Sequence, residues 1–271
     1  MVIDFHTHAF PDNLAEKAMT VLTESAAGEY IPVHDGTIAG LLKNMDNCSI
    51  DISVVLPIVT KQSQTKNVNE WAADVNSQYS GRIICFGSIF PNTDGDNYKS
   101  DIDYIASLGL RGLKFHAEYQ NFILDDEKML RIYDYALSKN LIIVHHAGYD
   151  PAFPAPFRSS PRQFANIIDE MQGGTIIAAH LGGHAQWDDV EKYLCGKNIY
   201  LDTSMGFEYF TQEQFLRILQ NHGADKILFA TDSPWSDAKP EIEHIKSLPI
   251  SESERDAILY KNAEKLLYDY I

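Results

Sequence analysis

Leu141-Ile142-Ile143-Val144-His145-His146 is the stretch that decides the fold. Its four aliphatic residues do not alternate with polar ones, and this is typical of a parallel strand that is covered on both faces. Seven more short apolar runs occur, each followed by a stretch with helical periodicity. The strands expected from these runs are residues 2–6, 52–56, 83–89, 112–116, 141–146, 175–180, 199–202 and 227–232.

Eight strand-and-helix units at intervals of about thirty residues predict an α/β fold, a closed (β/α)8 TIM barrel. The helices expected between the strands include residues 67–79, 125–139, 161–171, 188–194 and 211–221. An open doubly wound sheet is the competing architecture, but the sequence has neither of the glycine-rich phosphate loops typical of such sheets. We expect one domain over residues 1–271, with an extra helix or lid in the long first interval, residues 9–51.

Composition excludes several classes of protein. Twenty-two basic and 38 acidic residues give a net charge of −16, which disfavours binding to nucleic acid. No apolar run approaches the roughly 18 residues of a membrane span, and the N-terminus reaches Asp4 too early for a signal peptide. Three scattered cysteines fit a reducing compartment. The sequence therefore predicts a cytoplasmic protein with a small-molecule substrate; whether it forms a homo-oligomer stays open.

Polar residues end the predicted strands. They are His6 and His8, His116, His145 and His146, His180, and Asp232. In a (β/α)8 barrel the chemistry takes place at the C-terminal ends of the strands. His6 and His8 are two residues apart, so both imidazoles face the same side and can bind a cation such as Zn²⁺. Asp232 brings a carboxylate from the last strand, which adjoins the first when the barrel closes.

Two further histidines are candidates. Adjacent strand residues point to opposite faces, so only one of His145 and His146 can face the axis. We favour His146 because the loop opens directly after it, with His145 packed outward against a helix. His180 precedes two glycines that let the chain turn sharply, and its imidazole suits proton transfer near neutral pH. His184 is expected at a helix start or on the surface.

Lys114 and His116 share one face of the fourth strand and are expected to be an additional metal site or to line the pocket. Lys114 could anchor a substrate carboxylate, bridge two metals once carboxylated, or pair with Asp4 or Asp202. Asp4 either orients an imidazole by a hydrogen bond or is a structural buried carboxylate.

The loop after the fifth strand, residues 149–161, is rich in proline and phenylalanine. Arg158 in this loop is a candidate for gripping a substrate carboxylate, or else pairs with a surface acid. Trp235 is expected to bind substrate, together with Phe10, Phe153 and Phe157 in a planar pocket. The alternatives are a loop that packs on itself and a loop that covers an oligomer partner.

Five blocks of sequence together resemble the amidohydrolase superfamily, in the branch that includes aminocarboxymuconate-semialdehyde decarboxylase and related hydrolases. These blocks are residues 3–11 (IDFHTHAFP), 114–116 (KFH), 146–148 (HAG), 179–183 (AHLGG) and 231–235 (TDSPW). The resemblance implies a (β/α)8 barrel with a mononuclear site, commonly Zn²⁺, held by His6, His8, His146 and Asp232. It also implies that His180 assists proton transfer or orients a water molecule.

Three functions follow as hypotheses. The favoured one is a metal-dependent hydrolase of a small amide, ester or lactone, in which a metal-activated water loses its proton to Asp232. The alternative is a metal-dependent, non-oxidative decarboxylase of a small planar carboxylic acid. A catalytically silent metal-binding barrel is disfavoured because mere binding would not need His180. The expected cofactor is one divalent metal, Zn²⁺ in the first place with Mn²⁺ as the alternative, and a second metal stays open.

Overall fold

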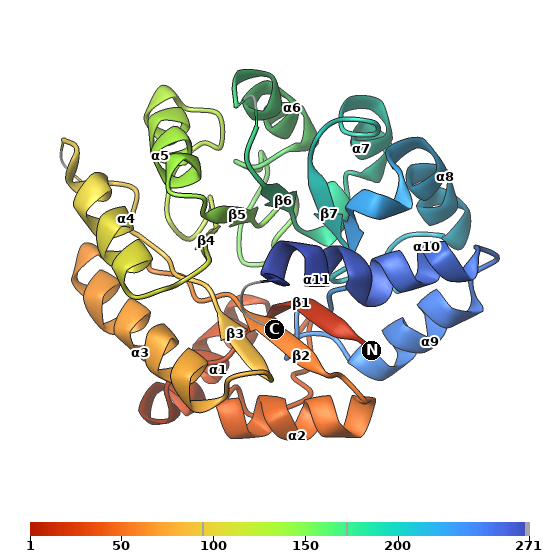
Figure 1. The fold of residues 1–271 in the computed structure, drawn as a ribbon, viewed down its shortest axis with the longest axis horizontal. Coiled ribbons are helices and arrows are strands. Elements are labelled where there is room, and N and C mark those ends of the chain that lie inside the picture. Colours follow the sequence, from red (N-terminus) through yellow and green to blue (C-terminus); the bar gives the residue numbers. More distant parts are fainter. Residues whose placement is uncertain (94, 172, 269–271) are drawn as a thin grey trace.

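Eight parallel strands follow one another in chain order in residues 1–93, 95–171 and 173–268, which the computed structural model describes (Figure 1). They are β1 (Ile3–Thr7), β2 (Ile52–Val55), β3 (Ile83–Cys85), β4 (Gly112–Phe115), β5 (Ile142–His145), β6 (Ile176–Ala178), β7 (Tyr200–Asp202) and β8 (Ile227–Leu228). Each lies within a predicted strand or within one residue of it. Apart from β1, which keeps its predicted length, and β7, which loses only its first residue, the strands are shorter than predicted mainly because the residues at their C-terminal ends turn away into loops.

The strands close into a barrel at two joints. Between β3 and β4, Gly87 pairs with Leu113, and the Gly87 amide donates to the Gly112 carbonyl at 2.7 Å. Between β8 and β1, the Phe5 amide donates to the Phe229 carbonyl at 2.9 Å, and Thr7 pairs with Ser233. The predicted (β/α)8 barrel is confirmed.

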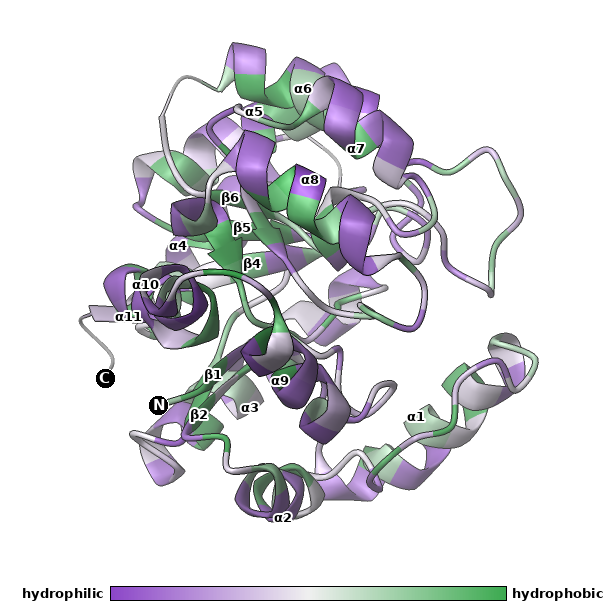
Figure 2. Cartoon of the chain, turned by 90° about the vertical axis from the view of Figure 1, so that its right-hand side faces the viewer, coloured by the Kyte–Doolittle hydropathy of each residue, from purple (hydrophilic) through white to green (hydrophobic). Residues whose placement is uncertain are grey.

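Helices surround the barrel, as Figure 1 shows. They are α1 (Asp12–Ser25), α2 (Ile38–Cys48), α3 (Thr65–Gln78), α4 (Asn97–Ser107), α5 (Glu127–Ser138), α6 (Pro161–Glu170), α7 (Trp187–Tyr193), α8 (Gln212–His222), α9 (Ala238–Ser247), α10 (Glu252–Asp256) and α11 (Asn262–Leu267). The long first interval holds α1 and α2. Figure 2 shows α1 standing away from the barrel, beyond the strand ends. Within the described part of the chain, no helix has the length and apolar character needed to cross a membrane.

Two apolar layers hold the strands in place. The inner one fills the barrel with side chains such as Phe5, Val54, Phe86 and Val144, and α11 adds Leu267 to it while packing against β1 and β8. The outer layer lies between strands and helices. Because the inner layer occupies the lower part of the barrel, space remains only at the C-terminal ends of the strands.

Candidate active site

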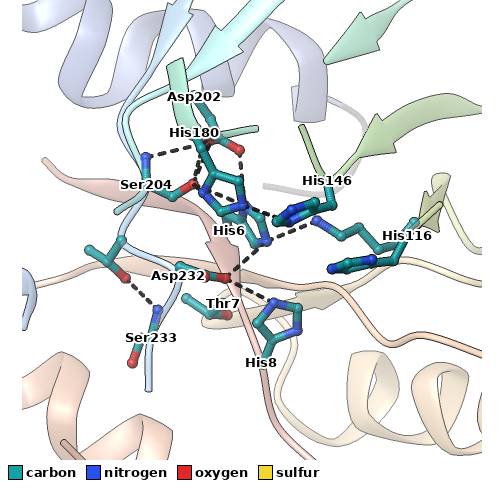
Figure 3. Close-up of polar contacts among 12 residues, drawn as sticks. His6, Thr7, His8, His116, His146, His180, Asp202, Ser204, Asp232 and Ser233 are labelled. Atoms are coloured by element: carbon teal, nitrogen blue, oxygen red, sulfur yellow. Dashed lines mark hydrogen bonds and ion pairs between the residues drawn. The ribbon is translucent and has the colours of Figure 1, made fainter. Parts of the chain in front are cut away.

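A cavity of about 550 Å³ opens at the C-terminal ends of the strands. Its walls contain all but one of the predicted site residues: His6, His8, Lys114, His116, His146, His180, Asp232 and Trp235. Figure 3 shows side chains at the strand ends, among them His6, His146 and Asp232, converging from different strands. The structure therefore gathers into one place residues that are more than 220 positions apart in the chain.

Three atoms of a kind that can bind a metal meet where β1 adjoins the residues after β8. The Nε2 atoms of His6 and His8 lie 3.2 and 3.0 Å from Oδ1 of Asp232. The pairing of β1 with β2 shifts register between Asp4 and Thr7, and this irregularity turns His6 toward the cavity although Ile3 and Phe5 already point into the barrel. All three atoms lie within 4.8 Å of one another, so one cation can bind them together.

Asp232 is held by its backbone as well as by its neighbours. Its amide donates to the His6 carbonyl at 2.8 Å, and its φ of +67° lies in the left-handed region that L-residues rarely adopt. Strained conformations of this kind concentrate at functional sites. Burial would raise the pKa of Asp232, but the imidazoles of His6 and His8 outweigh it and hold the pKa below its usual value. The side chain is therefore a carboxylate at neutral pH.

His6 is oriented by Asp202, at the end of β7, and not by Asp4. Its Nδ1 lies 3.0 Å from Oδ2 of Asp202 and 3.2 Å from the Ser204 hydroxyl. The Asp4 carboxylate instead accepts from the backbone amide and hydroxyl of Thr231 and from the His6 backbone amide. Asp4 thus has the structural role that was one of its two predicted alternatives. The register shift in β1 separates its carboxylate from the His6 ring.

His146 and His180 form a pair on the opposite side of the centre. Nε2 of His180 lies 3.0 Å from Nδ1 of His146, and Nδ1 of His180 lies 2.9 Å from the Ser204 hydroxyl. Both rings are buried, which lowers the pKa of each imidazole well below its usual value, so both are neutral. Nε2 of His146 is buried and has no hydrogen-bond partner among the described residues. A buried, unpaired imidazole nitrogen at this place is a good metal ligand.

His145 points the other way. Its ring stacks on Phe115 at 5.1 Å and meets the edges or faces of Tyr133 from α5 and Phe164 from α6. It belongs to the layer between strands and helices, whereas His146 lines the cavity. The structure thus places the two side chains on opposite faces of β5; the metal-binding role of His146 stays a prediction.

Lys114 and His116 both reach the cavity. Nζ of Lys114 lies 2.9 Å from Nε2 of His6, and burial lowers the pKa of this ammonium group to about 8. His116 stacks on His146 at 4.0 Å and its Nε2 lies 3.1 Å from Oδ2 of Asp150. His116, His146 and Asp150 could also hold a cation, so the number of metals is not fixed by geometry.

Arg158 is the predicted site residue that the structure does not bring to the cavity. Its Nε lies 3.3 Å from the buried carboxylate of Glu118, and its backbone amide donates to the same side chain at 2.6 Å. The alternative of an ion pair with an acid therefore fits, although that acid is buried and not on the surface. Trp235 and Phe10 line the cavity, whereas the rings of Phe153 and Phe157 pack on Tyr119 and Tyr149.

Sequence reasoning missed four residues of the site: Asp150, His184, Asp202 as a partner of His6, and Ser204. The prediction for His184 was wrong: it is 3% exposed, lines the cavity and stacks on Tyr149 at 5.6 Å. The left-handed turn at residues 180–182 folds the chain back, and the Gly148–His184 bridge holds it there. Asp202 and Ser204 did carry a signal, because they are polar residues at the end of a predicted strand.

The donor set fits a divalent metal. Imidazole nitrogens from His6, His8 and His146 together with the Asp232 carboxylate are ligands that Zn²⁺ and other first-row divalent metals accept. The orphaned Nε2 of His146 and the Asp202 carboxylate behind His6 are both features of metal-binding histidines, whose second nitrogen is usually held by a carboxylate or another polar group.

The amidohydrolase family model matches residues 3–268, and the chain belongs to this family. It is therefore an enzyme of the amidohydrolase superfamily, whose members are metal-dependent. This family membership removes the catalytically silent barrel from the hypotheses. Among curated proteins, no sequence match is found.

Three solved structures illustrate the similarity in fold. An uncharacterised TIM-barrel protein from Bordetella bronchiseptica has a TM-score of 0.80 and 18% identity, covering 99% of each chain. The 5-carboxyvanillate decarboxylase of Novosphingobium aromaticivorans, complexed with manganese and 4-hydroxy-3-methoxy-5-nitrobenzoic acid, has a TM-score of 0.75 and 18% identity, covering 99% of this chain and 96% of its own. The 2,6-dihydroxybenzoate decarboxylase from Rhizobium has a TM-score of 0.73 and 16% identity, covering 98% of each chain.

Proposed function

We propose that this enzyme is a metal-dependent decarboxylase of a small planar carboxylic acid, and that His6, His8, His146 and Asp232 hold the metal. The observation that carries the proposal is the meeting of His6, His8 and Asp232 in a cavity that His146 also lines, in a fold shared with decarboxylases of aromatic acids. This reading replaces hydrolysis, which the sequence favoured, as the leading candidate.

The charges around the centre favour a carboxylate substrate. Nζ of Lys114 lies 2.9 Å from Nε2 of His6 and lines the same cavity, so an ammonium group stands beside the metal ligands. A bound Zn²⁺ or Mn²⁺ would supply a Lewis acid for a substrate oxygen. Lys114 would hold the second oxygen of the substrate carboxylate by a charge-assisted hydrogen bond.

Decarboxylation breaks the bond between the carboxylate and its carbon; the electron pair stays on that carbon, which then takes up a proton. We assign this transfer to Asp232. Its side chain is ionised and 13% exposed to the cavity, so it can take a proton from a water molecule in the cavity and deliver it to that carbon, while the hydroxide left behind is neutralised by solvent. His180, with both nitrogens engaged by Ser204 and His146, holds the His146 ring in position.

Hydrolysis of an amide, ester or lactone is the second candidate. It is favoured by one observation, the lowered pKa of Asp232, because a hydrolase needs a carboxylate that accepts a proton from water. The same residues would serve both reactions, so the products must decide between them.

The test is a product assay on protein loaded with Zn²⁺ or with Mn²⁺. We expect release of carbon dioxide from hydroxybenzoic acids, about one metal per chain, and loss of both metal and activity in the His6→Ala, His8→Ala variant. An acid appearing with a new alcohol or amine, without carbon dioxide, would establish hydrolysis instead. A protein that holds no metal after reconstitution would contradict both candidates.

A further inference from the structure

Helix α1 presents an apolar stripe to the cavity. The residues of α1 that line the cavity are spaced as one face of a helix. They are Leu14, Ala18, Val21 and Leu22, with Lys17 as the single charged member. The neighbouring face packs on protein through Ala15 and Met19, which are buried. Leu14 and Val21 remain 51% and 50% exposed, although they face the cavity. Two large aliphatic side chains on this wall thus have no protein covering them fully.

The segment from residue 57 to 71, which we call the facing wall, lines the cavity mainly with apolar side chains, and Thr60 and Gln64 are its polar members. Pro57 and Ile58 follow β2, and Val68 and Trp71 come from α3; all four line the same cavity. Lys17 is the one charged residue that α1 and the segment from residue 57 to 71 contribute to the described lining. The outer half of the cavity is therefore a hydrophobic slot that leads to the polar centre.

The cavity is larger than a single aromatic ring requires. Its volume is about 550 Å³, whereas a cavity of about 150 Å³ accommodates benzene. A hydroxybenzoic acid bound at the centre would leave the slot between α1 and α3 filled only by water. Water molecules between two apolar walls make few hydrogen bonds, and replacing them with an apolar group removes apolar surface from water. This space is therefore suited to a larger apolar group.

Hydrogen bonds hold the segments before and after α1. The Phe10 amide donates to the Gly36 carbonyl at 2.8 Å, and the Val33 amide donates to the Pro234 carbonyl at 2.8 Å. The Tyr149 hydroxyl donates to the Glu29 carboxylate at 2.9 Å. The segment that carries α1 is thus tied to the barrel, and the apolar face of α1 forms part of the same cavity as the metal-binding residues.

We propose that the slot between α1 and α3 is a subsite for an apolar extension of the substrate, such as an alkyl chain or a second ring attached to the carboxylic acid. The inference rests on the proposed function in one respect: the carboxylate is placed at the metal centre. Lys17 disfavours a cationic extension, so the substrate class is an acid with a neutral or anionic apolar tail.

Calorimetry on the manganese-loaded protein tests this subsite without requiring turnover. Benzoate is compared with 4-butylbenzoate and with its cationic analogue 4-(3-aminopropyl)benzoate. Each buried methylene group contributes about fourfold in affinity. Allowing for partial burial, we expect 4-butylbenzoate to bind at least tenfold more tightly than benzoate, and the cationic analogue to lose this gain.

Variants of the two walls test whether the gain in affinity comes from the slot. Val21→Glu should bring 4-butylbenzoate to within about twofold of benzoate, and Val68→Glu on the facing wall should do the same. The control is Thr20→Glu, an adjacent exposed residue outside the stripe, which should keep the gain. Equal affinities in the wild type, absence of binding by either acid, or the same loss in the control would overturn the subsite.

The alternative occupant of the slot between α1 and α3 is a second copy of this chain. Sedimentation of the same proteins decides: a dimer that Val21→Glu dissociates, with ligand affinities unchanged, would overturn the proposal. Failure of the proposed function is separately visible, because it appears as absence of carbon dioxide release while the difference between the two benzoates persists.

Discussion

The two ends of the cavity are built in opposite ways. At the inner end, His6, His180 and Asp232 are each held by hydrogen bonds from neighbouring strands or loops, and two of the three have left-handed backbones. At the outer end, α1 offers aliphatic side chains that make no directional contact. Metal binding and proton transfer depend on angstrom-scale placement, whereas hydrophobic binding depends on area. The same cavity therefore combines a rigid chemical end with a tolerant recognition wall.

The largest expected effect lies at the rigid end. Asp232→Asn keeps the volume of the side chain but removes its charge and its capacity to carry a proton. We expect kcat to fall about 10³-fold, with an unchanged circular dichroism spectrum. Turnover within tenfold of the wild type would show that Asp232 is not the proton carrier. The inner end of the cavity would then not depend on the precise placement of this residue.

His145 and His146, at the end of β5, provide a matched test of the polar end of the cavity. His146→Ala removes the unpaired Nε2, and we expect metal content measured by elemental analysis to fall well below one per chain. His145→Phe is the matched variant: it replaces a ring that stacks on Phe115 and whose nitrogens have no hydrogen-bond partner in the described residues.

His145→Phe should keep the metal and leave the free energy of unfolding unchanged or raised by about 1 kcal/mol, because two unpaired buried nitrogens are removed. Loss of metal in His145→Phe, with retention in His146→Ala, would move the predicted ligand by one residue. Denaturant titration supplies the stability readout, and it also shows whether either variant has simply unfolded.

An effect of intermediate size is expected at Ser204. Its hydroxyl donates to Asp202 and contacts Nδ1 of both His6 and His180. Ser204→Ala should lower kcat by about tenfold and retain most of the metal, in line with the loss of a group that orients the proposed ligand His6 and its neighbour His180. A lowered melting temperature with unchanged kcat would instead mean that Ser204 only supports the fold.

The fold and the polar strand ends were predictable because both depend on local periodicity. Unbroken aliphatic runs mark covered parallel strands, and a closed barrel brings their ends together whatever the loops do. The strand ends that carry His6, His8 and Asp232 meet for this reason, although the inward turn of the His6 side chain also needs the irregular register of β1. The orientation of His146 followed from strand alternation and from the loop that opens after it.

The contacts behind these residues were not predictable from periodicity. Asp4 was a candidate to orient His6. Because the register of β1 is irregular, the carboxylate that contacts the His6 ring is that of Asp202. His184 enters the cavity through a turn with left-handed residues, and Arg158 is held away from it by Glu118. Such contacts depend on which strands and loops meet; the sequence marked Asp202 as a polar strand end, but it carried no signal for the partner of Asp202.

The smallest effect belongs to the outer wall. Tyr149→Phe removes one exposed hydrogen bond, that between its hydroxyl and Glu29, and leaves the ring in place on His184. Such a bond contributes about 1 kcal/mol at most, so we expect KM to rise less than fivefold, with kcat unchanged. Steady-state kinetics with a substituted and an unsubstituted benzoic acid gives the measurement. If α1 acts only as an apolar wall, the rise is confined to the substituted acid. A fall in kcat for both acids would mean that the tie at Glu29 also positions the centre, and the two ends would then not be independent.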